Sequence, residues 1–502
     1  MVSKITTATV VGLEAEVIEV EADVTNGLPA TIIVGLPDAA VQESKERVRS
    51  ALKNSSCQYP LTRVSVNLAP ADTQKIGTLF DVPIALAIML ASGQFSFDVS
   101  KRWFVGELSL DGTVRAVSGV LAIALKAKEC GVAELFVPLQ NAAEASLVQG
   151  LAVYPYKSLK QLLAHLLSVE LIPVQLPADI AVLFRQAPVA LDIAEVSGQE
   201  TAKRALEIAA SGGHNVLMSG PPGSGKTLLA RAMTGILPVM ELSECLELTK
   251  IYSIAGQLPV SGVVTQRPVR SPHHTTSSVA LVGGGASPKP GEITLSHRGI
   301  LFMDELPEFP RNVLEALRQP LEDGVVTVSR AKNTFTFPAK FMLVAALNPC
   351  PCGYFGDTSK RCICTPAQIF KYQKRLSGPL LDRIDLHIDV PRLPYEKIAT
   401  PVRAESSTTV QERVQAARKV QYARLGGAKT NSEMNVVEIR RCCILGVAEN
   451  KLLSLATQKY NLSGRSIHRM LKVARTIADL AGSEAITTDH LAESFQYRPK
   501  ED

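Results

Sequence analysis

The sequence predicts an α/β fold: a core on a parallel sheet, preceded by an α+β domain and followed by a small helical domain. Three apolar runs support this prediction, and each leads into polar residues where a buried strand would end. They cover 215–218, 299–303 and 341–347. The carboxyl ends of parallel strands meet at one edge of a sheet, so we expect the residues after these runs to gather in one site.

Length and composition indicate an ordinary globular protein of several domains. The chain has 502 residues, 46% of them hydrophobic and 20% charged, and its formal net charge is +5. This charge is too small to indicate nucleic-acid binding by itself, so a basic surface would have to be local. No apolar leader precedes the early acidic residues, and the longest apolar run, 82–95, is too short to span a membrane. We therefore expect a cytoplasmic protein without a membrane segment.

Residues 1–168 should form the α+β domain. Alternation of apolar and polar residues over 5–24 indicates one or two strands, and the apolar spacing over 38–54 indicates an amphipathic helix. The remaining expected elements are a strand at 62–68, a helix at 82–91, a hairpin over 103–117, a helix at 119–130 and a strand at 134–137.

Two segments of this domain, 77–83 and 117–121, match the segments that carry the catalytic dyad of Lon proteases. The domain resembles the C-terminal fold of those enzymes, whose dyad is a serine and a lysine. The serine position falls at Asp81 and the lysine position at Leu121. A serine nucleophile needs its hydroxyl and a nearby base, which neither residue supplies. The resemblance therefore implies an inactive domain, used for assembly or for contact with nucleic acid.

Residues 220–227 form a phosphate-binding loop between a predicted strand and a predicted helix. They fit the pattern G-x-x-x-x-G-K-[ST] in full, in the context that the pattern requires. The glycines allow a tight turn whose N–H groups point to phosphate oxygens, and the helix amino terminus adds partial positive charge. We expect Lys226 to contact the β and γ phosphates of ATP and Thr227 to bind Mg²⁺. The predicted nucleotide-binding residues of the loop are Gly220, Pro221, Pro222, Gly223, Ser224, Gly225, Lys226 and Thr227.

A proline-containing stretch, 169–189, should link the first domain to the core, which we expect over 190–395. The core begins with a segment, 191–199, that resembles the hydrophobic–x–x–Val–x–Gly–Gln segment of AAA+ proteins. In that family the segment contacts adenine. The resemblance therefore makes Val196 and Gly198 candidates for adenine binding.

Residues 299–305 predict a buried strand that ends in two acids, Asp304 and Glu305. We expect Asp304 to hold Mg²⁺ through water and Glu305 to polarise the attacking water. The alternative is a strand with two acidic end residues and no chemistry. The phosphate-binding loop about 80 residues earlier favours the catalytic interpretation.

Asn348 ends the next predicted strand, and Arg383 follows a Leu-Leu-Asp segment. In AAA+ proteins an asparagine at this place orients the lytic water. An arginine in this pattern acts as a finger on the ATP of a neighbouring subunit, which implies a ring. Arg383 could instead pair with Asp382 or Asp385, and Arg375 is the alternative finger.

The region between 267 and 293 strongly resembles the magnesium-chelatase-type ATPase signature. It contains His273 and His274, which should point to opposite faces if the chain is extended there, so we do not expect them to share a metal. Residues 323–337 predict a hairpin with Arg330 and Lys332 at its tip. A basic hairpin at this place is typical of AAA+ motors that grip DNA, although a solvated tip is the alternative.

Four cysteines lie within fifteen residues: Cys350, Cys352, Cys362 and Cys364. Four thiolates can complete a tetrahedral zinc site of the structural kind. Their C-x-C spacing is less diagnostic than C-x₂-C, so free loop thiols and redox disulfides stay open as alternatives.

Residues 396–502 predict a helical domain. Its helices should cover 408–425, 436–443, 447–460, 463–480 and 488–495. A small helical lid after the nucleotide domain fits AAA+ architecture. Arg465, in a Ser-Gly-Arg-Ser segment, resembles the second sensor arginine of that family. Arg469 is the alternative, and a solvated cation at the helix end is another.

Together, these motifs predict an ATP-hydrolysing AAA+ protein, and the resemblance to the ComM/YifB family covers nearly the whole chain. It implies a homohexameric ring that uses ATP and Mg²⁺ to drive branch migration of single-stranded or branched DNA during natural transformation. The alternatives are a metal-chelatase motor subunit that inserts magnesium into a porphyrin, a Lon-type protease and a non-motor assembly chaperone. Chelatase motor subunits lack the Lon-like domain, and Asp81 and Leu121 argue against a protease.

Overall fold

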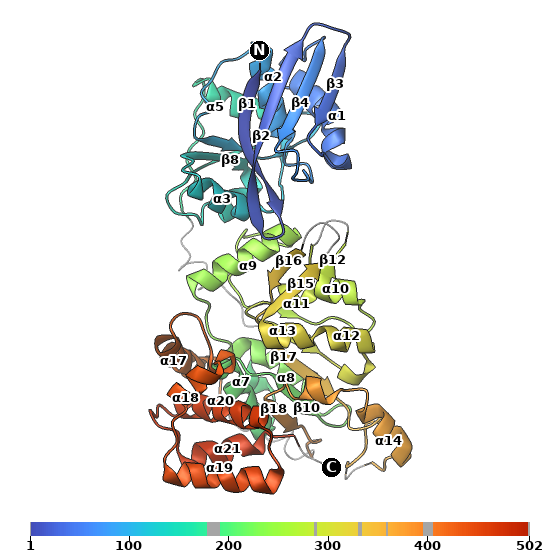
Figure 1. Ribbon diagram of the computed structural model, residues 1–502, viewed down its shortest axis with the longest axis vertical. Helices are drawn as coiled ribbons and strands as arrows, with labels where there is room; N and C mark the ends of the chain where they lie inside the picture. Colours follow the sequence, from blue (N-terminus) through green and yellow to red (C-terminus); the bar gives the residue numbers. More distant parts are fainter. Residues whose placement is uncertain are drawn as a thin grey trace. The chain divides into compact units, whose positions relative to one another are not determined.

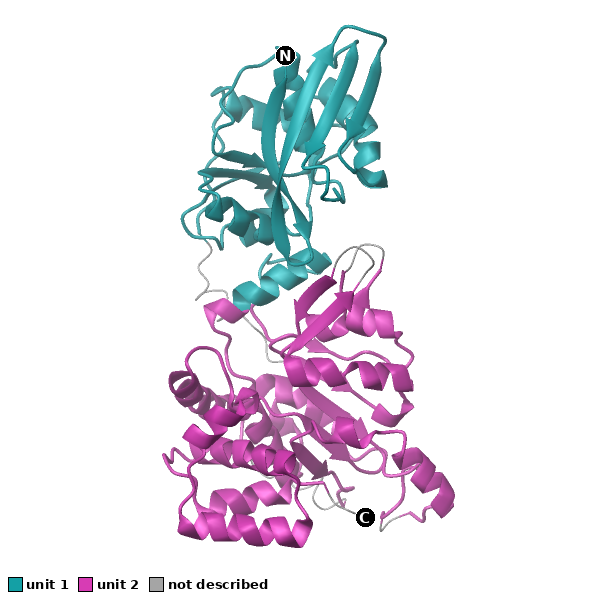
Figure 2. Cartoon of the chain, in the orientation of Figure 1, with its two compact units in different colours: residues 1–183, 245–264 teal, residues 184–244, 265–502 magenta. Residues whose placement is uncertain are grey.

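The computed structural model describes residues 2–177, 191–285, 289–329, 334–357, 360–394 and 405–499. The chain forms two compact units (Figure 2). Unit 1 comprises 1–183 with 245–264, and unit 2 comprises 184–244 with 265–502. Residues 245–264 lie within the range expected for the nucleotide-binding core, yet they pack with unit 1. In the described ranges no helix is both long enough and apolar enough to cross a membrane.

A four-stranded sheet and two helices form the first half of unit 1 (Figure 1). The order across the sheet is β1 (Ser3–Val11), β2 (Glu14–Thr25), β4 (Arg63–Ala69) and β3 (Ala30–Val34). Helix α1 (Ala39–Asn54) begins after Asp38, whose carboxylate accepts a hydrogen bond from the Val41 backbone. Helix α2 (Asp81–Ala91) packs against β1 and β2, and ten of its eleven residues are buried. The strands and helices predicted over 5–91 are therefore confirmed.

The second half of unit 1 contains a three-stranded parallel sheet in the order β5, β8, β9. It also contains the predicted hairpin, in which β6 pairs with β7. Its elements are β5 (Arg102–Phe104), β6 (Glu107–Leu108), β7 (Val114–Arg115), α3 (Val120–Glu129), β8 (Glu134–Pro138), α4 (Ala142–Ala145), β9 (Ala152–Tyr156) and α5 (Leu159–Leu166). Helix α9 (Leu242–Ala255) joins this unit through Ser253, which accepts a hydrogen bond from Gly119 and donates one to buried Glu144.

Unit 2 is built on a five-stranded parallel sheet. The order is β11 (Val269–Arg270), β14 (Ile300–Met303), β17 (Met342–Leu347), β10 (Val216–Ser219) and β18 (Leu386–Asp389). Strand β10 comes first in the sequence yet lies between the last two strands. In open α/β sheets, such a change in strand order creates a ligand-binding crevice at the carboxyl ends of the strands.

Helices and a hairpin surround this sheet. Apolar residues of β10, β14 and β17 share a core with α7 (Glu200–Gly212) and α8 (Lys226–Ala232). The predicted hairpin is present as β15 (Val325–Ser329) paired antiparallel with β16 (Thr334–Pro338). The other elements are α10 (Ser278–Val282), β12 (Gly283–Gly284), β13 (Lys289–Pro290), α11 (Glu292–Leu295), α12 (Arg311–Ala316), α13 (Arg318–Asp323), α14 (Pro366–Gln373) and α15 (Gly378–Leu381).

The five predicted C-terminal helices are all present. They are α17 (Ser407–Leu425), α18 (Val436–Cys442), α19 (Val447–Tyr460), α20 (Gly464–Leu480) and α21 (Thr488–Gln496). The apolar stripe of α20 packs against Leu491 and Phe495 of α21 in a core of their own. Ser463 caps α20 by accepting a hydrogen bond from the Ser466 backbone.

The two positions matched to the Lon dyad hold structural side chains. Asp81 is buried and accepts hydrogen bonds of 2.7 and 2.9 Å from Arg47 and of 3.1 Å from the Leu108 backbone. Burial raises the pKa of Asp81 to about 6, and Arg47 opposes the rise, so the carboxylate stays ionised at neutral pH. Leu121 lies buried in α3. Asp81 therefore anchors α1 to α2 through an ion pair.

Replacing Asp81 by alanine should lower the free energy of unfolding of unit 1 by about 3–5 kcal/mol, because Arg47 would lose its partner in a mostly buried place. Urea unfolding followed by the fluorescence of Trp103, the single tryptophan and a buried residue of unit 1, measures the change. As a control, Lys126→Ala removes an exposed ion pair with Glu129 and should leave the midpoint unchanged. Equal midpoints for Asp81→Ala and wild type would contradict the structural role.

Candidate nucleotide-binding site

The phosphate-binding loop connects β10 to α8, as predicted. Gly223 and Gly225 adopt φ of 75° and 95°, which favour glycine, and nothing lies within 4 Å of where a Cβ would be. The surface above these glycines is therefore open to a ligand. A Cβ on Gly220 would lie 2.1 Å from the carbonyl oxygen of Val390, so this glycine allows the loop to approach the end of β18.

The Lys226 side chain folds back onto the phosphate-binding loop. Its ammonium donates hydrogen bonds to the carbonyl oxygens of Gly220 (2.7 Å) and Pro221 (2.9 Å) and to Asn348 Oδ1 (3.3 Å). Burial lowers the pKa of Lys226. The predicted lysine and asparagine thus meet at the carboxyl edge of the sheet, where phosphate oxygens can replace the carbonyl acceptors.

Thr227 and Asp304 also come together at this edge. The threonine hydroxyl donates a 2.8 Å hydrogen bond to Asp304 Oδ2, so two oxygen atoms from α8 and the end of β14 converge. Hydroxyl and carboxylate oxygens are ligands that suit Mg²⁺, so this pair fits the expected ion. Glu305 follows in a turn with φ of 52°, and its half-exposed carboxylate lies 4.0 Å from His274 Nδ1.

The segment before α7 contacts the same loop, through a residue that the sequence did not single out. Val196 is buried in the core of unit 2, and a Cβ on Gly198 would lie 3.2 Å from Leu393. The next residue, Gln199, donates hydrogen bonds to the carbonyl oxygens of Ser224 (3.3 Å) and Pro391 (2.7 Å). Gln199 therefore ties the phosphate-binding loop to the segment after β18. Its place in the Val–x–Gly–Gln pattern was the one sequence signal for it.

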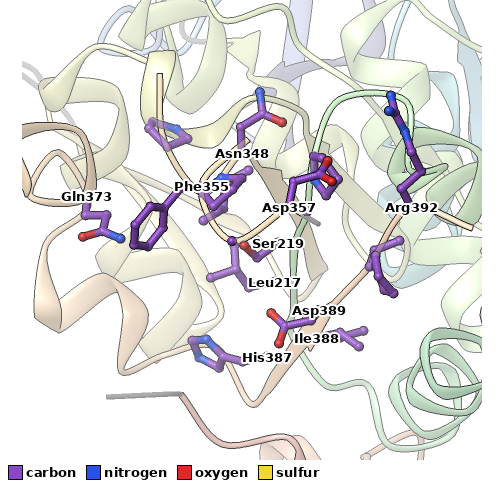
Figure 3. A pocket seen from close by; sticks show the side chains of 18 of the residues that line it. Leu217, Ser219, Asn348, Phe355, Asp357, Gln373, His387, Ile388, Asp389 and Arg392 are labelled. Atoms are coloured by element: carbon purple, nitrogen blue, oxygen red, sulfur yellow. The ribbon is translucent and has the colours of Figure 1, made fainter. Parts of the chain in front are cut away.

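A cavity of about 1010 Å³ adjoins the first residues of the loop (Figure 3). Figure 3 shows Asn348, Phe355 and Asp357 on its wall together with residues of β10 and β18. Burial lowers the pKa of His387, in β18, to about 4, so this imidazole is neutral at physiological pH. The volume matches that of ligand-binding sites in proteins.

The predicted arginines lie near the amino ends of the strands, opposite the end of the sheet that carries the phosphate-binding loop. Asn215, directly before β10, donates a 2.9 Å hydrogen bond to the carbonyl oxygen of Arg383. The four residues of β10 span about 13 Å, and the phosphate-binding loop follows their far end. Arg383 and Arg465 both bind the carboxylate of Glu322, the latter at 2.8 Å. The structure therefore brings the two arginines together, but away from Lys226 of the same chain.

The alternative arginines are held by their own chain. Arg375 pairs with Glu308 at 2.7 Å, and Arg469 donates a 2.7 Å hydrogen bond to the carbonyl oxygen of Ile384. Arg383 does not contact its sequence neighbours Asp382 and Asp385 through a described ion pair, and Glu322 is its carboxylate partner instead.

The four clustered cysteines converge after β17. Their sulfur atoms all lie within 4.8 Å of one another, and three pairs are separated by 3.4 to 3.7 Å. Hydrogen bonds from the Tyr354 and Ile363 backbones lower the pKa of Cys352 to about 6. The described residues include all nine cysteines, and none of them forms a disulfide. Within those residues, no other group of three or more cysteine, histidine or acidic side chains could hold a metal ion.

Two further predictions can be compared with the structure. The expectation that His273 and His274 point to opposite faces is wrong: their rings lie 4.0 Å apart, because the chain turns at 274–275 instead of running straight. Arg330 and Lys332 lie outside the described residues, whereas both strands of their hairpin are described.

Known proteins resemble this chain over nearly its whole length. The family model for magnesium chelatase, subunit ChlI, matches residues 192–398, and two related models match 20–141 and 404–498. Competence protein ComM of Haemophilus influenzae is 46% identical over 97% of this chain and 95% of its own length. The uncharacterized protein YifB of Escherichia coli is 43% identical over 98% and 96%. The magnesium-chelatase 38 kDa subunit of Cereibacter sphaeroides is 28% identical over 31% of this chain. The chain therefore belongs to the ComM/YifB family of magnesium-chelatase-like AAA+ proteins.

Proposed function

We propose that this chain is an ATP-driven DNA motor: a homohexameric branch-migration helicase that acts in the cytoplasm on transforming DNA during recombination. The observation that carries the proposal is the separation of Arg383 from Lys226 across β10, since one chain then holds half of a hydrolysis site. A ring would pair each phosphate-binding loop with the arginines of a neighbour. The competence protein at 46% identity supports DNA as the substrate.

Each residue of the site has a distinct part in the proposed hydrolysis. The loop N–H groups and Lys226 would bind the phosphates, while Thr227 and Asp304 would hold Mg²⁺, which neutralises charge on the β and γ phosphates. Glu305 would accept a proton from the attacking water, and Asn348 would orient that water with its amide. Arg383, and beside it Arg465, would stabilise negative charge on the ATP of the adjacent subunit.

The remaining parts complete the proposal. We assign 1–168 to an inactive Lon-like domain, 190–395 to the ATPase core, apart from 245–264, which pack with unit 1, and 396–502 to a helical lid. Val196 and Gly198 would border the adenine, and Cys350, Cys352, Cys362 and Cys364 would hold a structural zinc ion. Arg330 and Lys332 would contact DNA phosphates, because they lie in the sequence between the paired strands β15 and β16.

A chelatase motor subunit is the less supported alternative. The chelatase relative matches 31% of this chain, whereas the competence protein matches 97%. A non-motor assembly chaperone would hydrolyse ATP without any response to DNA. The response of the ATPase to DNA therefore separates the proposed function from both alternatives.

Replacing Glu305 by glutamine should reduce ATP hydrolysis at least about 100-fold, because the amide cannot accept the proton of the attacking water. Binding of a fluorescent ATP analogue should persist, since Lys226 and Thr227 are intact. Phosphate release at saturating ATP measures the loss. Glu315→Gln, which alters a carboxylate paired with Arg318 elsewhere on the same unit, is the matched control. Wild-type turnover in Glu305→Gln would remove this residue from the mechanism.

Lys226→Ala and Arg383→Ala should each abolish most ATPase activity, with the arginine change costing about 10³-fold or more. A one-to-one mixture of the two variants should recover part of the activity, because an Arg383→Ala loop can meet an intact Arg383 from a Lys226→Ala neighbour. A mixture of Lys226→Ala with the Lys226→Ala/Arg383→Ala double variant contains no intact phosphate-binding loop, so it should stay inactive. No recovery in the first mixture would count against shared sites.

Single-stranded or forked DNA should stimulate the ATPase, and the protein should displace a labelled strand. Arg330→Ala/Lys332→Ala should weaken DNA binding and flatten its dependence on log salt by about 1.4, for two phosphate contacts to a single strand. Fluorescence anisotropy over a salt series measures this slope. Lys451→Ala/Lys459→Ala, two exposed lysines of α19, should leave the slope unchanged. An ATPase indifferent to DNA, with no strand displacement, would overturn the proposed function.

A further inference from the structure

We infer that the four cysteines hold one zinc ion that fixes the Asn348 end of β17 against the phosphate-binding loop, so that metal occupancy controls the rate of ATP hydrolysis. The zinc site itself stands on the geometry of the cluster. The effect on hydrolysis rests on the proposed ATPase function.

The sulfur positions suit a single tetrahedral ion. Zinc–sulfur bonds of about 2.3 Å place neighbouring sulfurs about 3.8 Å apart in a tetrahedron. The three sulfur pairs among Cys350, Cys352 and Cys362 are at 3.4, 3.6 and 3.7 Å, whereas a disulfide would require about 2.05 Å. The Phe355 backbone N–H lies 3.3 Å from Cys350 Sγ and donates to it, which supports the negative charge of a thiolate. Cys350, Cys352 and Cys362 therefore already lie at metal-binding separation, and Cys364 Sγ lies within 4.8 Å of all three.

The segment between β17 and α14 that carries the four cysteines, here called the cysteine loop, has little regular structure or buried apolar surface in its described residues. Between β17 and α14, no helix or strand forms in the described residues. Cys350 is buried, but the other three cysteines are partly exposed, and Ile363 between the last two is 85% exposed. A loop that buries so little apolar surface cannot offset its conformational entropy by packing. A metal ion can supply that free energy, as structural zinc does in small domains.

The same loop contacts the nucleotide site in two ways. Pro349 alone separates Cys350 from Asn348, whose side-chain oxygen accepts a hydrogen bond from Lys226. Gly353, with φ of 83°, lies directly on the phosphate-binding loop: a Cβ there would be 2.5 Å from Pro222 Cδ. The turn from Cys350 to Gly353 is closed by a 2.9 Å backbone hydrogen bond. A metal that fixes this turn therefore fixes Asn348 relative to Lys226.

Figure 3 shows residues of the cysteine loop beside residues of the nucleotide site in the cavity. Phe355 and Asp357, which belong to the cysteine loop, share the cavity wall with Asn348 and with Ser219, the residue before the phosphate-binding loop. Release of the metal would free this wall and the strand end together. Because misplacing a catalytic group by about 1 Å can reduce a rate about 100-fold, turnover should suffer more than ATP affinity.

The first test is metal content, which does not depend on any activity. The purified full-length chain should contain one zinc per chain, and growth with Co²⁺ should give the absorption bands of a cobalt–tetrathiolate centre. Cys352→Ser and Cys364→Ser should lose the ion, while Cys130→Ser, at an exposed free cysteine of unit 1, should retain it. Wild-type protein without zinc would overturn the site, whatever its ATPase rate.

The second test is the effect on hydrolysis. Cys364→Ser, or wild type treated with a chelator, should show turnover reduced by up to about 100-fold with ATP affinity much less affected, and zinc should restore the chelated wild type. If the metal acts through Asn348, then Cys364→Ser in an Asn348→Ala background should cause little further loss. Additive losses, or full turnover without zinc, would overturn the coupling. A zinc-containing wild type that lacks all ATPase would instead refute the proposed function and leave the metal site standing.

Discussion

The parallel pairing of β10 with β17 and of β17 with β14 is the constraint on which the site depends. Ser219 pairs with Leu347, and Met303 pairs with Ala345, so the three strands end at nearly the same level. The Gly220 backbone then donates to the Leu347 carbonyl oxygen, which carries this alignment one residue into the loop. A shift of one residue in this register would turn every side chain to the other face of the sheet and separate Lys226 from Asn348.

The two edges of this sheet have different electrostatic roles. The carboxyl edge holds a partly buried ammonium and the Thr227–Asp304 pair, a set that suits a triphosphate with its metal ion. The amino edge holds Arg383 and Arg465, both bound to Glu322. These arginines already have a carboxylate partner, so a neighbouring triphosphate would have to compete with Glu322 for them. In the proposed ring, Glu322 would hold these arginines in place while no neighbouring ATP is bound.

The cysteine loop extends the carboxyl edge beyond the sheet. It begins one residue after Asn348 and returns to Pro222, so it bridges the ends of β17 and β10 on the side where nucleotide would bind. With the proposed metal bound, such a bridge would add rigidity where the proposed hydrolysis is most sensitive to small displacements. In unit 1, the Asp81–Arg47 pair has a comparable role between α1 and α2.

The sequence by itself predicted many of the strands and helices and named the residues of the candidate site. The elements followed from periodicity, the loop 220–227 from its motif, and Asp304 from acids at a strand end, because these signals are local along the chain. Elements such as β3, β9 and α9 were not predicted. Only the tertiary structure decided which distant residues meet. Glu322 with Arg383, Gln199 with Pro391, Gly353 with Pro222 and 245–264 with unit 1 are contacts across long stretches of chain, for which no local pattern exists. The close approach of the His273 and His274 rings was missed for a related reason, since the turn at 274–275 contains no glycine or proline that would have indicated it.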